Sequence, residues 1–127
     1  MRRGLAALIV ALSGPACAQE ALLAVPLSEM MAPVVDEILP MERCAGLLLS
    51  LVDPSLSDTE TARRLLAAER MVATAERLTQ ETRPGRAPGA PRRAVERYAR
   101  AYRERDEAGQ PFPPGDRAIC EDLVREP

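Results

Sequence analysis

Three cysteines limit how this chain can fold, and they lie at positions 17, 44 and 120. Cys17 falls inside a segment with the pattern of an export leader, whose removal leaves two cysteines. In the oxidising space that exported proteins reach, such a pair forms a disulfide. Neither Cys44 nor Cys120 belongs to a C-x-x-C motif, so a thioredoxin-like redox role has little support. We expect a structural Cys44–Cys120 disulfide, with a free pair or an intermolecular bridge as alternatives.

The first eighteen residues have the three parts of a secretory signal peptide. Two arginines follow the initial methionine, residues 5–12 (LAALIVAL) are apolar, and small residues precede the cleavage position. Ala16 and Ala18 stand where a signal peptidase reads the chain. The pattern predicts a signal peptide over residues 1–18, cleavage after Ala18, and a periplasmic or secreted product.

Two other interpretations of this segment were weighed. A spanning anchor needs about 20 apolar residues, and this run has about half that number. A lipoprotein would carry its lipid on Cys17, but Gly14 stands where such sites have a large aliphatic residue. No later run is apolar for long enough to span a bilayer, so we expect no stable membrane insertion after cleavage.

The remaining residues 19–127 suit a single domain, and their apolar side chains recur at helical spacing. No stretch alternates like a β-strand. The sequence therefore predicts an all-α fold, a small bundle of three to four helices closed by the Cys44–Cys120 disulfide. Residues 19–39 are expected to form a loosely ordered N-terminal part. The expected helices are 40–52, 57–82, 91–108 and one starting near Asp116, with residues 83–90 as an interhelical linker.

Several single residues carry more local predictions. Ser57 and Glu60 have the spacing of a capping box at the start of the helix 57–82. Gly46 is expected where a second backbone approaches closely, and Asp116 is expected to cap the last helix. Phe112 is a candidate plug into the core. The expected buried face of helix 57–82 holds Leu65, Ala68, Met71, Val72, Ala75 and Leu78.

The residue types that are missing exclude much catalytic chemistry. The chain has no His and no Lys, and all 17 basic residues are Arg. Without His there is no Ser–His–Asp or Cys–His nucleophile, no His-ligated zinc and no proximal-His haem. Without Lys there is no Schiff base and no P-loop lysine. We expect no catalytic residues, no cofactor and no metal site.

Charge is distributed unevenly along the chain. Residues 83–105 hold eight arginines and two glutamates, a net charge of +6, whereas residues 19–82 have a net charge of −6. Arg93, Arg97 and Arg100 fall on one side of the expected helix 91–108 and could contact an anionic partner. The alternative is that these arginines compensate the acidic helix 57–82. Nucleic acid is not an expected partner, because residues 19–127 have a net charge of −4.

These observations lead to three functional hypotheses. The first is a small secreted or periplasmic helical protein that is not an enzyme and binds another envelope protein. The second is a periplasmic acid-stress chaperone, because nearly every side chain that titrates in acid is a carboxylate. The third is a binder of anionic envelope components through the segment Arg83–Arg105. Neither the biological process nor the oligomeric state follows from the sequence.

Overall fold

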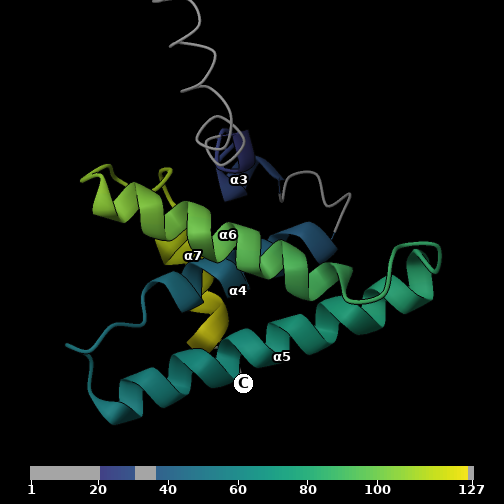
Figure 1. Ribbon diagram of the computed structural model, residues 1–127, viewed down its shortest axis with the longest axis horizontal. Coiled ribbons are helices and arrows are strands. Elements are labelled where there is room, and N and C mark those ends of the chain that lie inside the picture. Colours follow the sequence, from purple (N-terminus) through teal and green to yellow (C-terminus); the bar gives the residue numbers. More distant parts are fainter. Residues whose placement is uncertain (1–20, 31–36, 126–127) are drawn as a thin grey trace, which may run out of the picture.

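The computed structural model describes residues 21–30 and 37–125, which fold into five helices with no strand among them (Figure 1). The all-α prediction is confirmed. The expected signal peptide, residues 1–18, lies outside the described residues. The helices are α3 (Leu27–Met30), α4 (Ile38–Ser50), α5 (Asp58–Thr82), α6 (Ala90–Glu107) and α7 (Asp116–Arg125).

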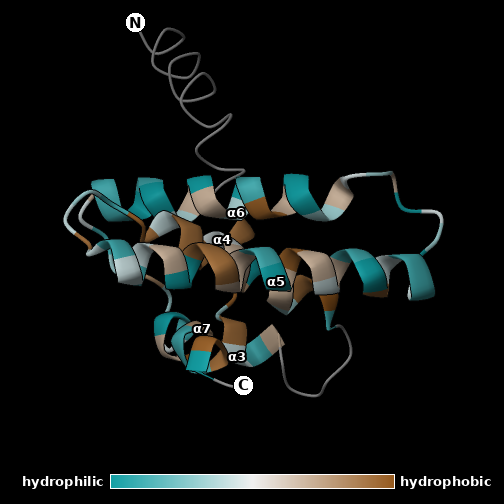
Figure 2. Ribbon diagram, turned by 90° about the horizontal axis from the view of Figure 1, so that it is seen from below, coloured by the Kyte–Doolittle hydropathy of each residue, from teal (hydrophilic) through white to brown (hydrophobic). Residues whose placement is uncertain are grey.

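Helix α4 is the centre of the bundle. It packs along both α5 and α6 and more briefly against α7, whereas α5 and α6 share a smaller contact. Figure 2 shows α6 on one side of α4, with α7 and α3 next to each other on the opposite side. Most of α4 is buried, from Glu42 to Leu48 without a break. Helix α4 therefore contacts α5, α6 and α7, whereas α3 packs against α7.

The predicted disulfide is present and joins α4 to α7. The Cα atoms of Cys44 and Cys120 lie 5.2 Å apart, and both side chains are fully buried. Because α7 has a short interface with α4, this covalent bond adds a fixed connection to the few contacts between the two helices.

Local sequence explains where α5 begins. The Ser57 hydroxyl accepts a hydrogen bond from the Glu60 amide at 3.1 Å, so Ser57 is the N-cap as predicted. The Glu60 carboxylate pairs with Arg64 at 2.9 Å, one turn later. The helix ends at Thr82, two residues before Pro84, because a proline cannot continue the ladder.

Helix α4 starts two residues earlier than expected. Ile38 is its first residue, so Pro40 is its third rather than its first. A proline costs little there, because amides of the first turn have no partner within the helix. Gly109, with φ of 72°, follows the end of α6 as predicted.

The predicted buried face of α5 is only partly buried. Ala68, Met71, Val72 and Ala75 are buried, but Leu65 is 42% exposed, which corrects the prediction for that residue. At this turn Arg64, whose side chain is 12% exposed, faces α7 and lies 3.7 Å from Glu121, and Leu65 lies on the outer side. Helix α5 is also the longer helix, with 25 residues against 13 in α4. The first turns of α5 extend past the end of α4 (Figure 1).

The segment 21–30 packs onto the bundle. Leu23 is 3% exposed and Leu27 is fully buried, and both belong to the core that surrounds the disulfide. The expectation of loose order for residues 19–39 therefore does not describe these two side chains.

Candidate functional site

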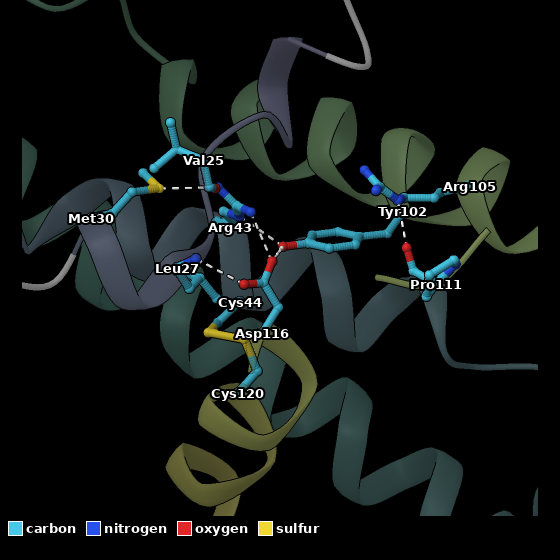
Figure 3. A network of polar contacts seen from close by, with 10 residues as sticks. All are labelled: Val25, Leu27, Met30, Arg43, Cys44, Tyr102, Arg105, Pro111, Asp116 and Cys120. Atoms are coloured by element: carbon cyan, nitrogen blue, oxygen red, sulfur yellow. Dashed lines mark hydrogen bonds and ion pairs between the residues drawn. A yellow bond between two sulfur atoms is a disulfide. The ribbon is translucent and has the colours of Figure 1, made fainter. Parts of the chain in front are cut away.

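A network of three buried polar side chains lies where α4, α6 and α7 meet (Figure 3). The guanidinium of Arg43 and the carboxylate of Asp116 form an ion pair at 2.7 Å, and both are fully buried. Tyr102 connects them, because its hydroxyl accepts from Arg43 Nε and donates to Asp116 Oδ2, each at 2.7 Å. A buried ion pair is tolerated only when its remaining polar atoms are also bonded, as they are here.

The environment shifts the pKa values of two members in directions that keep the network intact. Burial alone would lower the pKa of Arg43, but its contacts with Tyr102 and Asp116 raise it above the usual value. Burial raises the pKa of Tyr102 far above its ordinary value. Arg43 thus stays charged and Tyr102 stays neutral across the physiological range.

The same network also binds the main chain of residues 21–30. Arg43 Nη1 donates to the Val25 carbonyl at 2.5 Å, and Asp116 Oδ1 accepts from the Leu27 amide at 2.8 Å. The sequence predicted Asp116 as the cap of the last helix. It is instead the first residue of α7, and its side chain points into the core, where Arg43, Tyr102 and Leu27 all donate to it.

A second buried carboxylate secures the loop between α5 and α6. Glu42 is fully buried, and its two oxygens accept from Arg86 at 2.8 and 3.2 Å. This fork-to-fork pairing fixes the predicted linker 83–90 against α4. Adjacent residues of α4 therefore bind two distant parts of the chain. Glu42 binds Arg86 in the linker, and Arg43 binds Asp116 in α7.

The buried polar side chains described above connect α4 to α6, to α7 and to the linker 83–90. Within the described ranges, every buried side-chain nitrogen and oxygen has a hydrogen-bond partner. The same residues contain no cluster of three His, Cys, Asp or Glu side chains that could hold a metal ion. A pocket of about 560 Å³ has Asp106 and Glu121 in its lining, and Glu121 is engaged there by Arg117 at 3.3 Å.

The arginines singled out from the sequence lie together on the outside of α6. Arg93, Arg97 and Arg100, here called the α6 arginine surface, are all exposed. Arg93 Nη2 donates to the Pro88 carbonyl at 2.9 Å. Arg97 and Arg100 form no hydrogen bond or ion pair with any described residue.

Compensation by the acidic helix is small. Among the described residues one ion pair links α6 to α5, between Arg92 and Glu69, with oxygens at 3.1 and 3.2 Å from the guanidinium. The Arg92 side chain lowers the pKa of Glu69. Arg92 is not part of the α6 arginine surface. Charge compensation by the acidic helix α5 therefore describes Arg92, next to that surface, but not Arg93, Arg97 or Arg100.

The buried network was missed by the sequence analysis. Glu42 and Arg43 are two charged residues directly before Cys44 in a segment that is otherwise largely apolar. Charged residues at buried helical positions are rare unless they are paired, and this signal could have drawn attention to them.

Comparisons of the chain with protein-family models, with curated proteins and with solved structures found no match. In the described residues no helix combines the length and the apolar character that crossing a bilayer requires.

Proposed function

We propose that this chain is a small exported binding protein, without enzymatic activity, that acts on another envelope protein. It contacts an acidic patch of that partner through the α6 arginine surface. The observation that carries the proposal is that Arg97 and Arg100 are exposed and have no hydrogen-bond or ion-pair partner in the described chain. A guanidinium offers two parallel donors to a carboxylate, so such a surface favours acidic side chains.

The pattern of charge favours a protein over a uniformly anionic lipid or polysaccharide. Glu96 and Glu104 are also exposed on α6, among the arginines. An alternating surface is matched by a partner that places its own charges in register, whereas a continuous sheet of negative charge would repel the glutamates. The net charge of −4 over residues 19–127 opposes adsorption to an anionic membrane as well.

The rigidity of α6 also supports a binding role. The helix packs along the central helix α4 and buries Tyr98 and Tyr102, so its outer face is fixed before any partner arrives. A preorganised surface loses less conformational freedom on binding and therefore keeps more of its contact energy.

Export is the second part of the proposal. A buried disulfide is typical of proteins that fold outside the cytoplasm. Intact-mass analysis of the protein purified from its native host should give a chain that begins at Gln19. A chain that retains residues 1–18 would contradict export with cleavage.

The test of the binding surface is a capture experiment with matched variants. The chain starting at Gln19 and its triple variant R93Q/R97Q/R100Q are used to recover partners from envelope extract at low and at raised salt. The control is R63Q/R70Q/R77Q, which removes the same charge from the exposed side of α5. We expect the same protein to be recovered by the parent and the control, to be lost with the α6 variant, and to be weakened by salt.

Two outcomes would refute the proposal. One is recovery of the same partner by the α6 variant. The other is equal loss with both triple variants, which would mean that overall charge rather than this surface is responsible. Binding to vesicles that contain anionic lipid, lost only in the α6 variant, would replace the protein partner by an anionic envelope component.

A further inference from the structure

The exposed side of α6 carries charges of both signs along its whole length, and α6 forms one side of the bundle (Figure 2). The exposed charged residues that make up this α6 outer face are Arg93, Glu96, Arg97, Arg100, Arg103, Glu104 and Glu107. Apart from the bond of Arg93 to the Pro88 carbonyl, none of them forms a hydrogen bond or ion pair with a described residue. None of these side chains is apolar, so the order of charge decides which partner fits.

The two edges of the α6 outer face carry their charges in opposite order. Seven residues make about two helical turns, so residues seven apart lie above one another, about 10.5 Å apart along the helix. One edge holds Arg97 and then Glu104. The other edge, about 100° away around the helix, holds Glu96 and then Arg103. Each edge thus has one positive and one negative end.

This order makes the face complementary to itself. When two identical helices pack antiparallel about a two-fold axis, each edge meets the same edge of the other copy in reverse. Arg97 then faces Glu104 of the second copy on one edge, and Glu96 faces Arg103 of the second copy on the other. Both pairs are centred within one residue of position 100, so one axis satisfies both edges.

The middle of the face decides the direction of the pairing. It holds Arg93, Arg100 and Glu107, again seven residues apart. In an antiparallel pair Arg93 faces Glu107 of the second copy at each end, and Arg100 alone meets its own counterpart at the axis. A parallel pair would also match opposite charges at the edges, but it would place all three middle residues against their own counterparts. Antiparallel packing therefore has fewer like-charge contacts.

We propose that α6 binds the α6 of a second copy of this chain, antiparallel, with Arg100 at the two-fold axis. The face itself supplies acidic and basic groups in matching positions, which favours a second copy over a partner that is merely acidic. Exposed ion pairs are individually weak, so the dimer is transient, with a dissociation constant of about 1 mM or lower at low salt, and salt dissociates it. The self-pairing does not rest on the proposed function, but it covers the α6 arginine surface and competes with any other partner there.

Exchanging charges on one edge tests the pairing. R97E places a glutamate against Glu104 of the second copy and should abolish the dimer, whereas R97E/E104R restores opposite charges and should restore the dimer. R70E is the matched control, because it makes the same charge change on an exposed α5 arginine and should leave the dimer intact. All variants are made in the full sequence, purified as the host processes it and checked for helix content.

Sedimentation at low salt, up to about 1 mM protein, measures the dimer in each variant. A parent protein that stays monomeric at that concentration would overturn the proposal. So would an R97E variant that dimerises like the parent, or an R97E/E104R variant as monomeric as R97E.

Introduced cysteines test the direction. On mild oxidation, R100C should cross-link to a second R100C chain across the axis. R93C and E107C should cross-link to each other in a mixture, and neither should cross-link to itself. The native Cys44 and Cys120 are bonded to each other and buried, so the introduced thiol is the free one. Self-cross-linking of R93C, which a parallel pair would give, or no cross-link of R100C would overturn the proposal.

The variant R100Q separates this proposal from the proposed function. It removes the like-charge contact at the axis, so the dimer should become tighter, by about twofold or more. The same change removes a guanidinium from the α6 arginine surface and should weaken capture of an acidic partner. A dimer weakened by R100Q would contradict the antiparallel pairing. Failure to capture any partner, with the charge-exchange results as expected, would refute the proposed function and support this proposal.

Discussion

Gly46 of α4 faces Tyr98 of α6 at the closest approach of the two helices. A Cβ atom on Gly46 would lie 2.5 Å from the Tyr98 Cβ, 2.8 Å from the Ala99 nitrogen and 2.9 Å from the Val95 oxygen. Two of these neighbours are backbone atoms, which cannot move aside as the end of a side chain can. The absence of a side chain at this position therefore sets the distance between the two helices.

Replacing Gly46 by alanine should force α4 and α6 apart. Despite the better helix propensity of alanine, we expect the free energy of unfolding to fall by about 1–3 kcal/mol or more. Chemical denaturation followed by circular dichroism measures the change. Gly85→Ala is the control, because a Cβ there meets nothing within 4 Å, and it should shift stability by no more than about 1 kcal/mol. Equal effects of the two substitutions would contradict the close approach.

Tyr102→Phe should show how much the buried network contributes. The change removes one hydroxyl, which accepts from Arg43 and donates to Asp116, and leaves the ring that packs on Phe112. Hydrogen bonds to charged groups are each worth about 1.5–3 kcal/mol, and two are removed, so the free energy of unfolding should fall by at least the value of one such bond. Tyr98→Phe is a matched control, because the Tyr98 hydroxyl bonds to no described residue. A variant as stable as the parent would mean that the hydroxyl is dispensable.

Removing the disulfide should destabilise the protein strongly. The bond joins residues 76 positions apart, and the chain-entropy model gives about 4 to 4.5 kcal/mol for a loop of this length. We expect C44A/C120A to lose a comparable amount in denaturant unfolding. The losses in hydrogen-exchange protection should be largest in α7 and in the amide of Leu27, which depends on Asp116. Equal loss of protection in all helices would contradict the prediction that the disulfide mainly stabilises the position of α7.

Acid should break the link between α5 and α6 at Glu69. The hydrogen bond and the charge of Arg92 lower the pKa of Glu69 below its usual value. A lowered pKa contributes stability above the ordinary pKa of the carboxyl group, and that stability is lost as the pH falls through the lowered value. The effect on stability is small because the pair is exposed. A carboxyl NMR titration should show the pKa of Glu69 returning to its usual value in R92Q and remaining low in R93Q.

The acid-stress hypothesis stays a prediction, and measurements at low pH can test it. If acid converts the protein into a client-binding form, lowering the pH to about 3 should expose apolar surface and loosen the packing. Dye binding and near-ultraviolet circular dichroism report those changes. A compact and unchanged protein at that pH would remove the hypothesis.

Sequence patterns predicted the features that depend on neighbouring residues. Ser57 and Glu60 start α5 through a bond between residues three apart, and Gly109 ends α6 through its own backbone angle. The disulfide was predictable for a different reason, because only two cysteines, with one intramolecular pairing, remain when the predicted leader that contains Cys17 is set aside. Close packing at Gly46 was expected, whereas its partner Tyr98 was not identifiable from spacing.

The features that sequence patterns missed depend on residues far apart in the chain. Arg43 and Asp116 are separated by 73 positions, and nothing near Asp116 distinguishes a helix cap from a buried acceptor. Leu65 fits the apolar stripe of α5, but in the folded chain Arg64 faces α7 and Glu121 at this turn, and Leu65 is exposed. Arg93, Arg97 and Arg100 are exposed on α6, and their contact with a partner stays a prediction.

Glu42 and Arg43 are neighbours on α4 that direct two opposite parts of the chain to their places. An arrangement that moved Arg86 or Asp116 away from α4 would leave Glu42 or Arg43 as an unpaired buried charge, which costs several kcal/mol. These two charges therefore favour the placement of the linker and of α7 in which both are paired, a selectivity that leucine and alanine side chains alone do not provide.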